Sequence, residues 1–212
     1  MAETVKCDAF ADIYKSLEYC TGKMSMPGTR PRAYFIPKKH ITTWPTLPMA
    51  NATEMGKVAV YDGNFTLEAD KCFHYVDLVD GENEPKSEQV GSFGSMHFSN
   101  SLILVVPGTE EEATGLATML NNEDVVFIYI QRNGKARVMG NEMFRTSVKP
   151  SQSVGKATSD SNNTTLEVTV EDVAPAPFYP GDIVIDSKVV ISGATGKVKP
   201  TVTTNPSEGG GS

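Results

Sequence analysis

The stretch "GKATSDSNNTTLEVTVEDVAPAPFYPG", residues 155–181, decides the expected fold class. Apolar and polar residues alternate over 166–171, a period of two that is typical of a β-strand with one buried face. The preceding segment 159–163 is rich in Ser, Asp and Asn, which favour turns because their side chains bond the local main chain. The stretch therefore predicts a turn, a strand and a proline-rich end. It holds no catalytic nucleophile, general base or cluster of metal ligands.

Similar runs occur along the rest of the chain. The pair Asp62-Gly63 predicts a tight hairpin between strands 57–61 and 64–69, and Asn133-Gly134 predicts a second turn after an apolar strand. Further strands are expected at 32–37, 71–79, 90–108, 124–130, 135–140, 144–149 and 182–193. The count of eight to eleven strands predicts a mainly β protein with two packed antiparallel sheets, a sandwich or barrel-like fold.

One α-helix is expected over 109–121. Thr109 and Glu112 have the spacing of a capping box, in which each side chain accepts a hydrogen bond from a main-chain amide at the helix start. The apolar residues of the segment then recur on one face: Ala113, Leu116, Ala117 and Leu120. This pattern predicts a single amphipathic helix that flanks the sheets.

The two ends of the chain differ from this central region. Residues 8–20 place four apolar side chains on one face if they form a helix, but an irregular arm that docks on a neighbour fits the same residues. Residues 193–212 have too little apolar content to fold alone. We therefore expect an N-terminal arm or short helix at 1–30, a β-sandwich at 31–192 and a flexible C-terminal arm at 193–212.

A charged segment interrupts the predicted strands. Residues 80–89, "DGENEPKSEQ", contain no apolar side chain, so they cannot bury a face of their own. We expect 79–91 to be a solvated loop, or a segment that only a partner orders.

The charge distribution limits the possible partners. The 212 residues carry a net charge of −7, which argues against a nucleic-acid-binding surface over the whole chain. Residues 1–53 have an excess of basic side chains, whereas 54–124 are strongly acidic. Copies of such a chain can attract one another head to tail. The start of the chain lacks the apolar core of a signal peptide, and no apolar run is long enough for a membrane span, so we expect neither.

No motif in the sequence predicts a catalytic, cofactor or metal site. The three histidines lack metal-ligand spacing and are expected as surface or cross-strand residues: His40, His74 and His97. The three cysteines match neither a zinc site nor a disulfide framework and are expected as reduced thiols: Cys7, Cys20 and Cys72. Phosphate-binding, dinucleotide-binding and serine-hydrolase motifs are not found in the sequence either. We therefore expect no enzymatic activity and no cofactor.

Three stretches together resemble the major tail (tail tube) proteins of tailed bacteriophages. These are "SMPGTRPRAYFIPKKHITTWPTLP", then "GSFGSMHFSNSLILVVPG" followed by the helix and "VVFIYIQRNGKARVMG", and finally "SVGKATSDSNNTTLEVTVEDVAPAPFYPG". The resemblance is closest to the type carried by phages and prophages of gut Bacteroidetes. It covers roughly residues 10–181.

The resemblance implies a structural role in the virion tail, with assembly in the cytoplasm of the bacterial host. Tail tube proteins form rings, usually of six copies, in which inner strands make a continuous barrel around a lumen that conducts DNA. The partners would be other copies, other tail proteins, and DNA that passes without sequence-specific binding. By this resemblance 79–91 would be the loop that stacks rings, with the charged residues Asp80, Glu82, Glu84, Lys86 and Glu88, and the terminal arms would bind the next ring.

Two alternatives remain open at the level of sequence. One is another ring-forming tail component, such as a tail terminator, which forms one ring and stops. The other is a monomeric β-sandwich that binds a sugar or a host protein on an exposed aromatic platform made of Trp44, Tyr61, Tyr75 and Tyr129.

Overall fold

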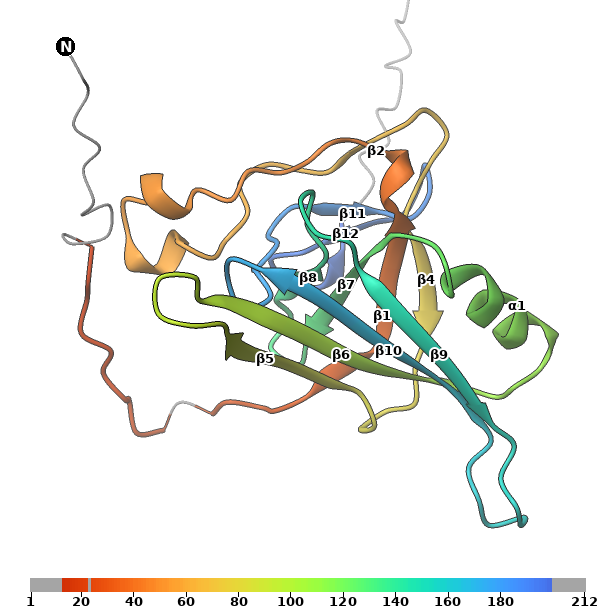
Figure 1. Ribbon diagram of the computed structural model, residues 1–212. Helices are drawn as coiled ribbons and strands as arrows, with labels where there is room; N and C mark the ends of the chain where they lie inside the picture. The colour runs from red at the N-terminus through yellow and green to blue at the C-terminus, as the bar shows by residue number, and fades with distance from the viewer. Residues whose placement is uncertain (1–12, 23, 200–212) are drawn as a thin grey trace, which may run out of the picture.

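The structure is a computed structural model that describes residues 13–22 and 24–199. Within these residues the chain forms thirteen β-strands, one α-helix and three 3₁₀-helices (Figure 1). The strands make four sheets, and all paired strands are antiparallel. The predicted fold class is confirmed: two large antiparallel sheets pack together and one helix flanks them.

The first large sheet lies in the middle of the molecule. Its strand order is β4 (His74–Asp77), β1 (Thr29–Pro37), β7 (Val125–Gln131) and β8 (Ala136–Met139). Every residue of β7 except the last is buried, as its continuous apolar run predicts. The predicted turn at Asn133-Gly134 joins β7 to β8, and Gly134 has a φ of 92°, a conformation that favours glycine.

The second large sheet lies in front of the first in Figure 1. Its order is β5 (Glu84–Val90), β6 (His97–Pro107), β10 (Asn163–Asp172) and β9 (Ser147–Ser153). The longest register in the molecule joins β6 to β10, with ten consecutive pairs from Asn163 opposite Pro107 to Asp172 opposite Phe98. The strand predicted around 166–171 is therefore confirmed as β10, an inner strand of this sheet.

Smaller elements cover the outer face of the first sheet. Two short sheets join β2 (Ile41–Thr43) with β3 (Thr66–Leu67), and β11 (Asp182–Val184) with β12 (Val190–Ser192) and β13 (Lys197–Val198). The 3₁₀-helices are η1 (Lys38–His40), η2 (Met49–Asn51) and η3 (Met55–Lys57). The first sheet consequently has protein on both of its faces.

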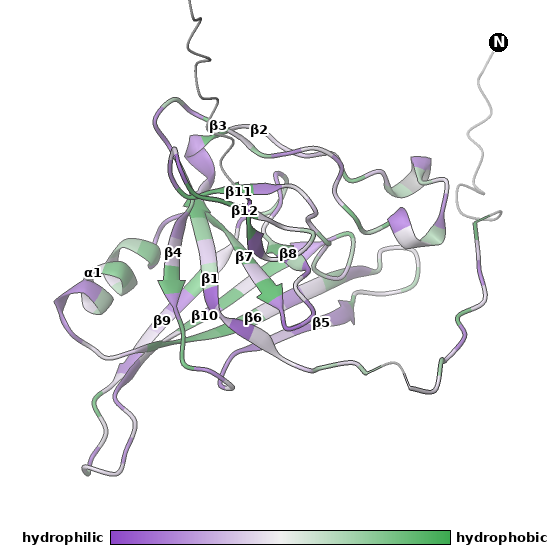
Figure 2. Ribbon diagram, turned by 180° about the vertical axis from the view of Figure 1, so that it is seen from behind, coloured by the Kyte–Doolittle hydropathy of each residue, from purple (hydrophilic) through white to green (hydrophobic). Residues whose placement is uncertain are grey.

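The main hydrophobic core lies between the two large sheets. Alternate residues of β6 and β10 point inward and are almost fully buried: Leu102, Leu104, Leu166, Val168 and Val170. They pack against residues of the first sheet: Ala33, Val76, Phe127, Tyr129 and Met139. Burying a side chain of this size typically contributes about 1.5–3 kcal/mol, so this layer holds the sandwich together. Figure 2 shows the hydrophobic residues gathered on these inner strands, whereas β5 is largely hydrophilic.

A second core covers the opposite face of the first sheet. Tyr179 lies at its centre and is fully buried. Its hydroxyl accepts a hydrogen bond from the amide of Phe65 (3.2 Å) and donates one to the carbonyl of Asp182 (3.0 Å). Burial raises the pKa of Tyr179 to about 12, so the phenol stays protonated and can donate. These bonds fix the short β11–β13 sheet on the first large sheet.

The proline-rich segment after β10 crosses the end of the sandwich and closes one sheet edge. The buried side chain of Asn100 donates to the carbonyl of Ala174 and accepts from the amide of Ala176, both at 3.0 Å. The following residues then pair with β8. The amide of Val138 donates to the carbonyl of Pro177 (3.0 Å), and the amide of Tyr179 donates to the carbonyl of Ala136 (2.9 Å). The outer edge of β8 is thereby covered.

The single helix α1 (Glu111–Leu120) flanks the side of the sandwich where β4 and β9 lie. Ala117 and Leu120 are buried and Leu116 packs against the main core, as the predicted apolar stripe requires. The predicted capping box is wrong. The helix begins after Glu110, no side chain caps it, and the hydroxyl of Thr109 instead donates to Oδ1 of Asn162 (2.8 Å). The nearby β9–β10 hairpin supplies a partner that competes with the local cap.

The predicted hairpin at 57–69 is also wrong. Residues 55–57 form η3, and β3 pairs with β2 across a long connection instead of with its sequence neighbour. Asp62 forms a bridge with Thr46, and Val60 forms one with Phe178. Gly63 does turn the chain, with a φ of 87°. The turn was thus predicted correctly, but its flanking residues find partners far away in the sequence.

The boundaries of the two arms differ from those predicted. The described part of the N-terminal segment, 13–22 and 24–28, has no helix, so the helical alternative fails for these residues, and β1 already begins at Thr29. At the other end, β13 pairs with β12, which extends the folded part to 199. Residues 1–12, 23 and 200–212 lie outside the described part, as does Cys7.

Asp172 yields a stability prediction. Its Oδ1 accepts a hydrogen bond from the amide of Val173 (2.7 Å), while the buried Oδ2 has no hydrogen-bond partner among the described residues. Burial raises the pKa of Asp172, so its carboxyl is harder to ionise in the folded state than in the unfolded state. The stability contributed by that proton is therefore present at low pH and lost as pH rises from the unfolded-state pKa through the raised one. We expect Asp172→Asn to increase the free energy of unfolding at pH 7 by about 1 kcal/mol, and by less at pH 4.

Urea unfolding of both proteins at the two pH values measures this difference. Glu167→Gln is a matched control, because Glu167 is an exposed carboxylate on the same strand, and it should leave the free energy of unfolding unchanged. An equal gain at both pH values would contradict the assignment to the Asp172 proton.

Candidate assembly surface

The segment predicted as a loop, 79–91, is mostly a strand. Glu84–Val90 form β5, which pairs with β6 in a continuous register from Glu84 opposite Ile103 to Val90 opposite His97. Only the residues before β5 form the turn. There, Asn83 holds the chain by donating to the carbonyl of Val79 (2.6 Å) and accepting from the amide of Val105 (3.0 Å).

The five charged residues of this segment consequently lie in two different elements, the turn and β5. Asp80 and Glu82 lie in the turn, where Oδ1 of Asp80 binds the guanidinium of Arg132 at 2.7 Å. Glu84, Lys86 and Glu88 alternate along β5, and the ammonium of Lys86 lies 2.6 Å from Glu88 Oε1. The loop prediction failed because an edge strand gains its main-chain hydrogen bonds from its neighbour and needs no apolar face. The sequence does contain a signal for this strand, because charged residues occupy every second position: Glu84, Lys86 and Glu88.

The second large sheet has one face that the described residues leave uncovered over most of its area; only at the end where Val105 lies is it covered. We call this face the free face. On β6 and β10 it carries the residues between the buried ones: Ser99, Ser101, Ile103, Thr165, Glu167, Thr169 and Glu171. The registers add Glu84, Lys86 and Glu88 from β5, and Ser147, Lys149 and Ser151 from β9. The free face is therefore polar, made of small hydroxyl side chains between charged ones.

The charges on the free face are mainly negative. Four glutamates (Glu84, Glu88, Glu167 and Glu171) stand against two lysines (Lys86 and Lys149). Glu171 accepts a hydrogen bond from the hydroxyl of Ser99 (3.0 Å) and lies 3.1 Å from Nε2 of His97. The face thus has a net charge of −2 with His neutral, which suits a surface that repels phosphates.

Neither edge of this sheet pairs with a further strand of the described chain, although α1 packs beside β9, where the side chain of Gln152 donates to the hydroxyl of Thr114 (3.1 Å). Among the described residues, no main-chain group outside the sheet forms a hydrogen bond with β5 or β9. Each of these strands contains a proline, Pro85 in β5 and Pro150 in β9. Proline is tolerated on an edge strand where the missing N–H faces away from the ladder. The amides that point away from the sheet therefore belong to residues an even number of positions from these prolines. Ser87 on β5 is one of them.

The strand directions of the two open edges are opposite. Each neighbour in the order β5–β6–β10–β9 is antiparallel, so β9 runs against β5. A second copy related by a rotation would place its β5 beside β9 of the first copy in antiparallel orientation. The sheet can accordingly continue from copy to copy without a change of strand pattern.

The hairpin between β9 and β10 projects beyond the sandwich (Figure 1). Its tip, 154–162, is exposed throughout. Asp160 accepts hydrogen bonds from the amides of Lys156 (2.7 Å) and Ala157 (3.0 Å), and these bonds lower the pKa of its carboxyl. The turn predicted at 159–163 is therefore present and ordered by Asp160.

The other candidate sites are not assembled. Tyr61 and Tyr129 are buried in different cores on opposite sides of the first sheet, and Trp44 packs edge-on against Phe65. Tyr75 is half-exposed and stacks under the guanidinium of Arg32 at 4.1 Å. The aromatic platform required by the binding-module alternative is therefore absent from this arrangement.

The histidines are surface and cross-strand residues, as predicted. Nδ1 of His40 lies 2.8 Å from Oε2 of Glu68, and His74 packs on the ring of Phe35. Cys20 and Cys72 are free thiols. Over 13–22 and 24–199, no group of three His, Cys, Asp or Glu side chains is arranged to hold a metal ion.

No protein-family model, no curated protein and no solved structure matches this chain. None of the helices in the described part of the chain combines the length and apolar character needed to cross a membrane.

The sidedness of β10 gives a direct test of the free face. Leu166 points into the main core and is fully buried, whereas its neighbour Thr165 points to the free face. We expect Leu166→Ala to reduce the free energy of unfolding by about 2–5 kcal/mol, because it leaves a cavity. Thr165→Ala should change it by less than about 0.5 kcal/mol. Chemical denaturation measures both values, and similar losses for the two variants would show that the face is covered.

Proposed function

We propose that this chain is a self-assembling structural subunit that forms the tail tube of a bacteriophage. The copies pair along the edges of the β5–β6–β10–β9 sheet, close into a ring and stack into a tube through which DNA passes. The protein acts through its geometry and has no catalytic centre in this proposal. It would reside in the virion tail after assembly in the bacterial host.

The observation that carries the proposal is the combination of an uncovered polar sheet face with two open edges of opposite direction. Open sheet edges promote uncontrolled aggregation unless they are protected, and a closed ring removes them by pairing each edge with a neighbour. The charges also suit this pairing. On the free face, β5 has two glutamates and one lysine, whereas β9 has a single lysine.

The number of strands supports a wide lumen. Each copy would contribute four strands, and closed barrels of about 16–18 strands already leave an aqueous channel. Four copies would reach this range, and six copies would provide about 24 strands and a wider channel. The free face would line the channel, while the first sheet, its covering elements and α1 would lie outside.

The charge of the free face suits transport rather than binding. A protein that holds DNA neutralises phosphates with Lys and Arg, whereas this face has four carboxylates and two ammonium groups. The small hydroxyl side chains between them offer no wide hydrophobic or aromatic surface on which bases can stack. DNA would therefore slide past without being retained.

Imaging of the purified protein over a range of concentrations tests the proposal, with sedimentation velocity as the second measurement. Rings or tubes with an open centre are the expected result. A monomer at all concentrations would overturn it.

A proline at the open edge tests the pairing itself. Ser87 lies on β5 at a position whose amide faces outward, two residues after Pro85. Ser87→Pro removes one main-chain donor from each proposed interface, and we expect the concentration needed for assembly to rise about tenfold. Light scattering against concentration measures this value.

The matched control is Ser87→Ala, which keeps the amide and should assemble like the original chain. Urea unfolding of the monomer establishes that Ser87→Pro still folds. A folded Ser87→Pro protein that assembles normally would show that β5 is not an interface strand.

Reversal of charge tests which surface faces the DNA. Replacing Glu84, Glu88 and Glu167 by Lys changes the net charge of the free face from −2 to +4, since each replacement adds two charges. We expect this variant, once assembled, to bind duplex DNA with a strong dependence on salt. The control replaces three exposed glutamates elsewhere, Glu54, Glu110 and Glu142, and gives the same total charge.

Fluorescence anisotropy with labelled duplex DNA at several salt concentrations compares the two assembled variants. The free-face variant should bind at least about tenfold more tightly than the control. Equal affinity would indicate that the free face does not line the channel.

A further inference from the structure

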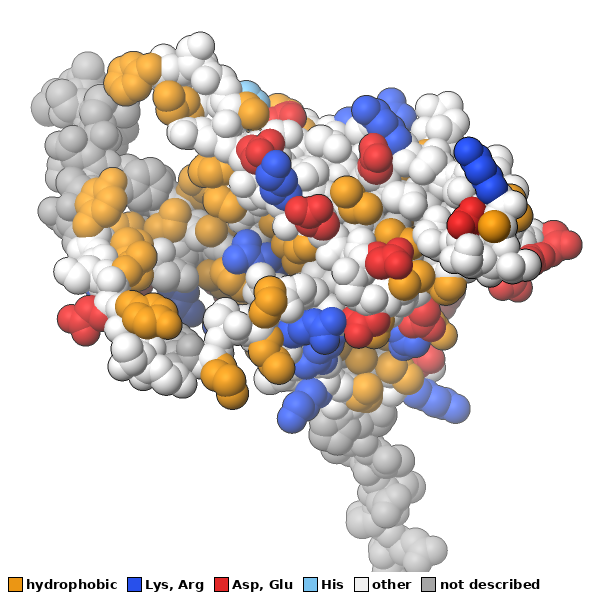
Figure 3. Space-filling view, turned by 90° about the horizontal axis from the view of Figure 1, so that it is seen from below, with side chains coloured by type: hydrophobic (Ala, Val, Ile, Leu, Met, Phe, Trp, Pro, Cys, Tyr) orange, Lys and Arg blue, Asp and Glu red, His pale blue; other side chains and the backbone are white. Residues whose placement is uncertain are grey.

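The N-terminal arm exposes more apolar surface than its own chain can cover. Residues 13–22 and 24–28 have no regular structure and stand away from the body of the molecule, with hydrophobic side chains spread along them (Figure 3). Tyr14, Leu17 and Tyr19 are 79%, 88% and 87% exposed. Large apolar side chains gathered on one segment generally mark a contact with another molecule.

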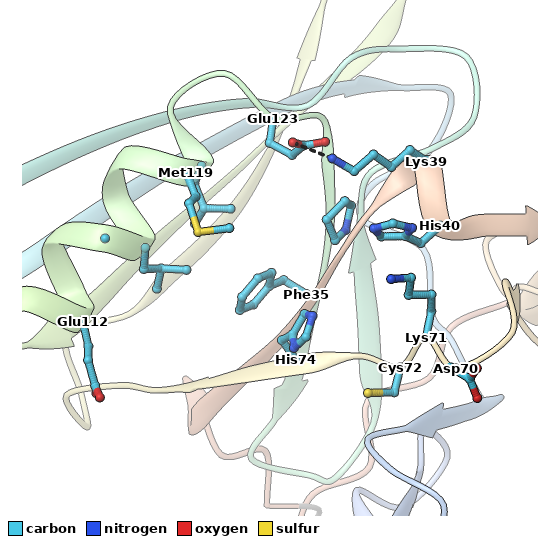
Figure 4. Close-up of a pocket in the computed structure, with 14 residues that line it drawn as sticks. Phe35, Lys39, His40, Asp70, Lys71, Cys72, His74, Glu112, Met119 and Glu123 are labelled. Carbon is cyan, nitrogen blue, oxygen red and sulfur yellow. Dashed lines mark hydrogen bonds and ion pairs between the residues drawn. The ribbon is translucent and has the colours of Figure 1, made fainter.

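A groove of about 690 Å³ lies on the body of the same chain, between α1 and the edge strand β4. Phe35 and Pro37 of β1 form part of its wall, and Leu116, Met119 and Leu120 of α1 face them. Figure 4 shows the side chains of Met119 and Phe35 directed into the space from opposite sides. Met119 is 75% exposed, so nothing in the described chain fills the mouth of the groove. We call this the α1 groove.

The rim of the α1 groove is charged. Lys39 and Glu123 form an ion pair of 3.0 Å at one end, and Lys71 and Glu112 lie at other points of the rim. An apolar floor with a charged rim suits a peptide that has both apolar and charged residues. Pockets of about 300–1,000 Å³ are typical for compact ligands, so this one has room for two or three large side chains.

The arm and the α1 groove lie at opposite ends of β1. The arm joins the body at Thr29, while Phe35 and Pro37 reach the groove. Phe35 lies six residue steps along the strand from Thr29, a distance of about 20 Å. In Figure 1 the arm leaves on the side away from α1. The arm can therefore extend directly to a second copy, whereas it would have to fold back to reach the groove of its own chain.

We propose that the arm of one copy binds in the α1 groove of a second copy. Tyr14, Leu17 and Tyr19 would fill the apolar floor, and the charges between them, Lys15 and Glu18, would meet the rim. This inference rests on the proposed tube assembly and identifies a contact separate from the β5–β9 edges. The arm is then the element that ties copies together beyond the pairing of strands.

The chain provides its own chemical probe for this contact. Cys20 lies in the arm beside Tyr19, and Cys72 lines the α1 groove. A flexible bismaleimide should therefore link Cys20 of one copy to Cys72 of another in a Cys7→Ser background. The experiment uses assembled protein made from equal amounts of ¹⁴N-labelled and ¹⁵N-labelled chains, and mass spectrometry of the linked peptides identifies the pairs. We expect Cys20–Cys72 peptides in which one partner is light and the other heavy.

The outcomes separate the possible explanations. Linked peptides that are only light–light or heavy–heavy would show that the arm binds its own chain, and would overturn the proposal. Assembled rings that give no Cys20–Cys72 peptide would also overturn it while leaving the tube intact. A chain that never assembles would instead contradict the proposed function.

Paired variants of exposed methionines provide the control. Met119→Glu places a charge in the mouth of the α1 groove and should reduce the yield of mixed peptides at least fivefold. Met143→Glu makes the same change at a methionine that is 71% exposed and outside the groove, and it should leave the yield unchanged. Equal yields for the two variants would exclude the groove as the receptor.

Discussion

The pairing of β6 with β10 is the contact on which the rest of the structure depends. Ten consecutive residue pairs fix the register, and this register decides which side chains enter the core and which form the free face. A slip of one residue would turn Leu166 outward and bring Glu167 into the core, so the apolar set strongly favours the observed pairing. β5 and β9 then attach to the outer edges of these two strands.

The sequence was informative wherever local pattern and tertiary environment agree. The alternation in β10, the apolar run of β7 and the stripe on α1 each predicted an element that the structure contains, because burial repeats with the period of the backbone. Turns at Gly63 and Gly134 were also predictable, since a positive φ favours glycine. The fold class follows from these features alone.

The errors share one physical cause, which is a distant partner. β5 has no apolar face and becomes a strand only because β6 offers its main chain. Thr109 has the spacing of a helix cap, yet its hydroxyl donates to Asn162 on the β9–β10 hairpin. The residues beside Gly63 pair with β2, Thr46 and Phe178 instead of with each other. Hydrogen bonds between segments far apart in sequence leave no apolar period, so the sequence indicates the candidate surface only through the alternation in β10 and the alternating charges of β5.

The same reasoning connects the two proposed contacts. Main-chain pairing along β5 and β9 is nearly independent of side-chain identity, so on its own it would allow any exposed strand to add to the edge. The arm differs, because Tyr14, Leu17 and Tyr19 are side-chain anchors that need a groove of matching shape and polarity. Edge pairing would thus provide most of the contact in a ring, while the arm would provide selectivity for another copy of the same chain. A subunit that uses both can keep its edges open before assembly and still avoid joining the wrong partner.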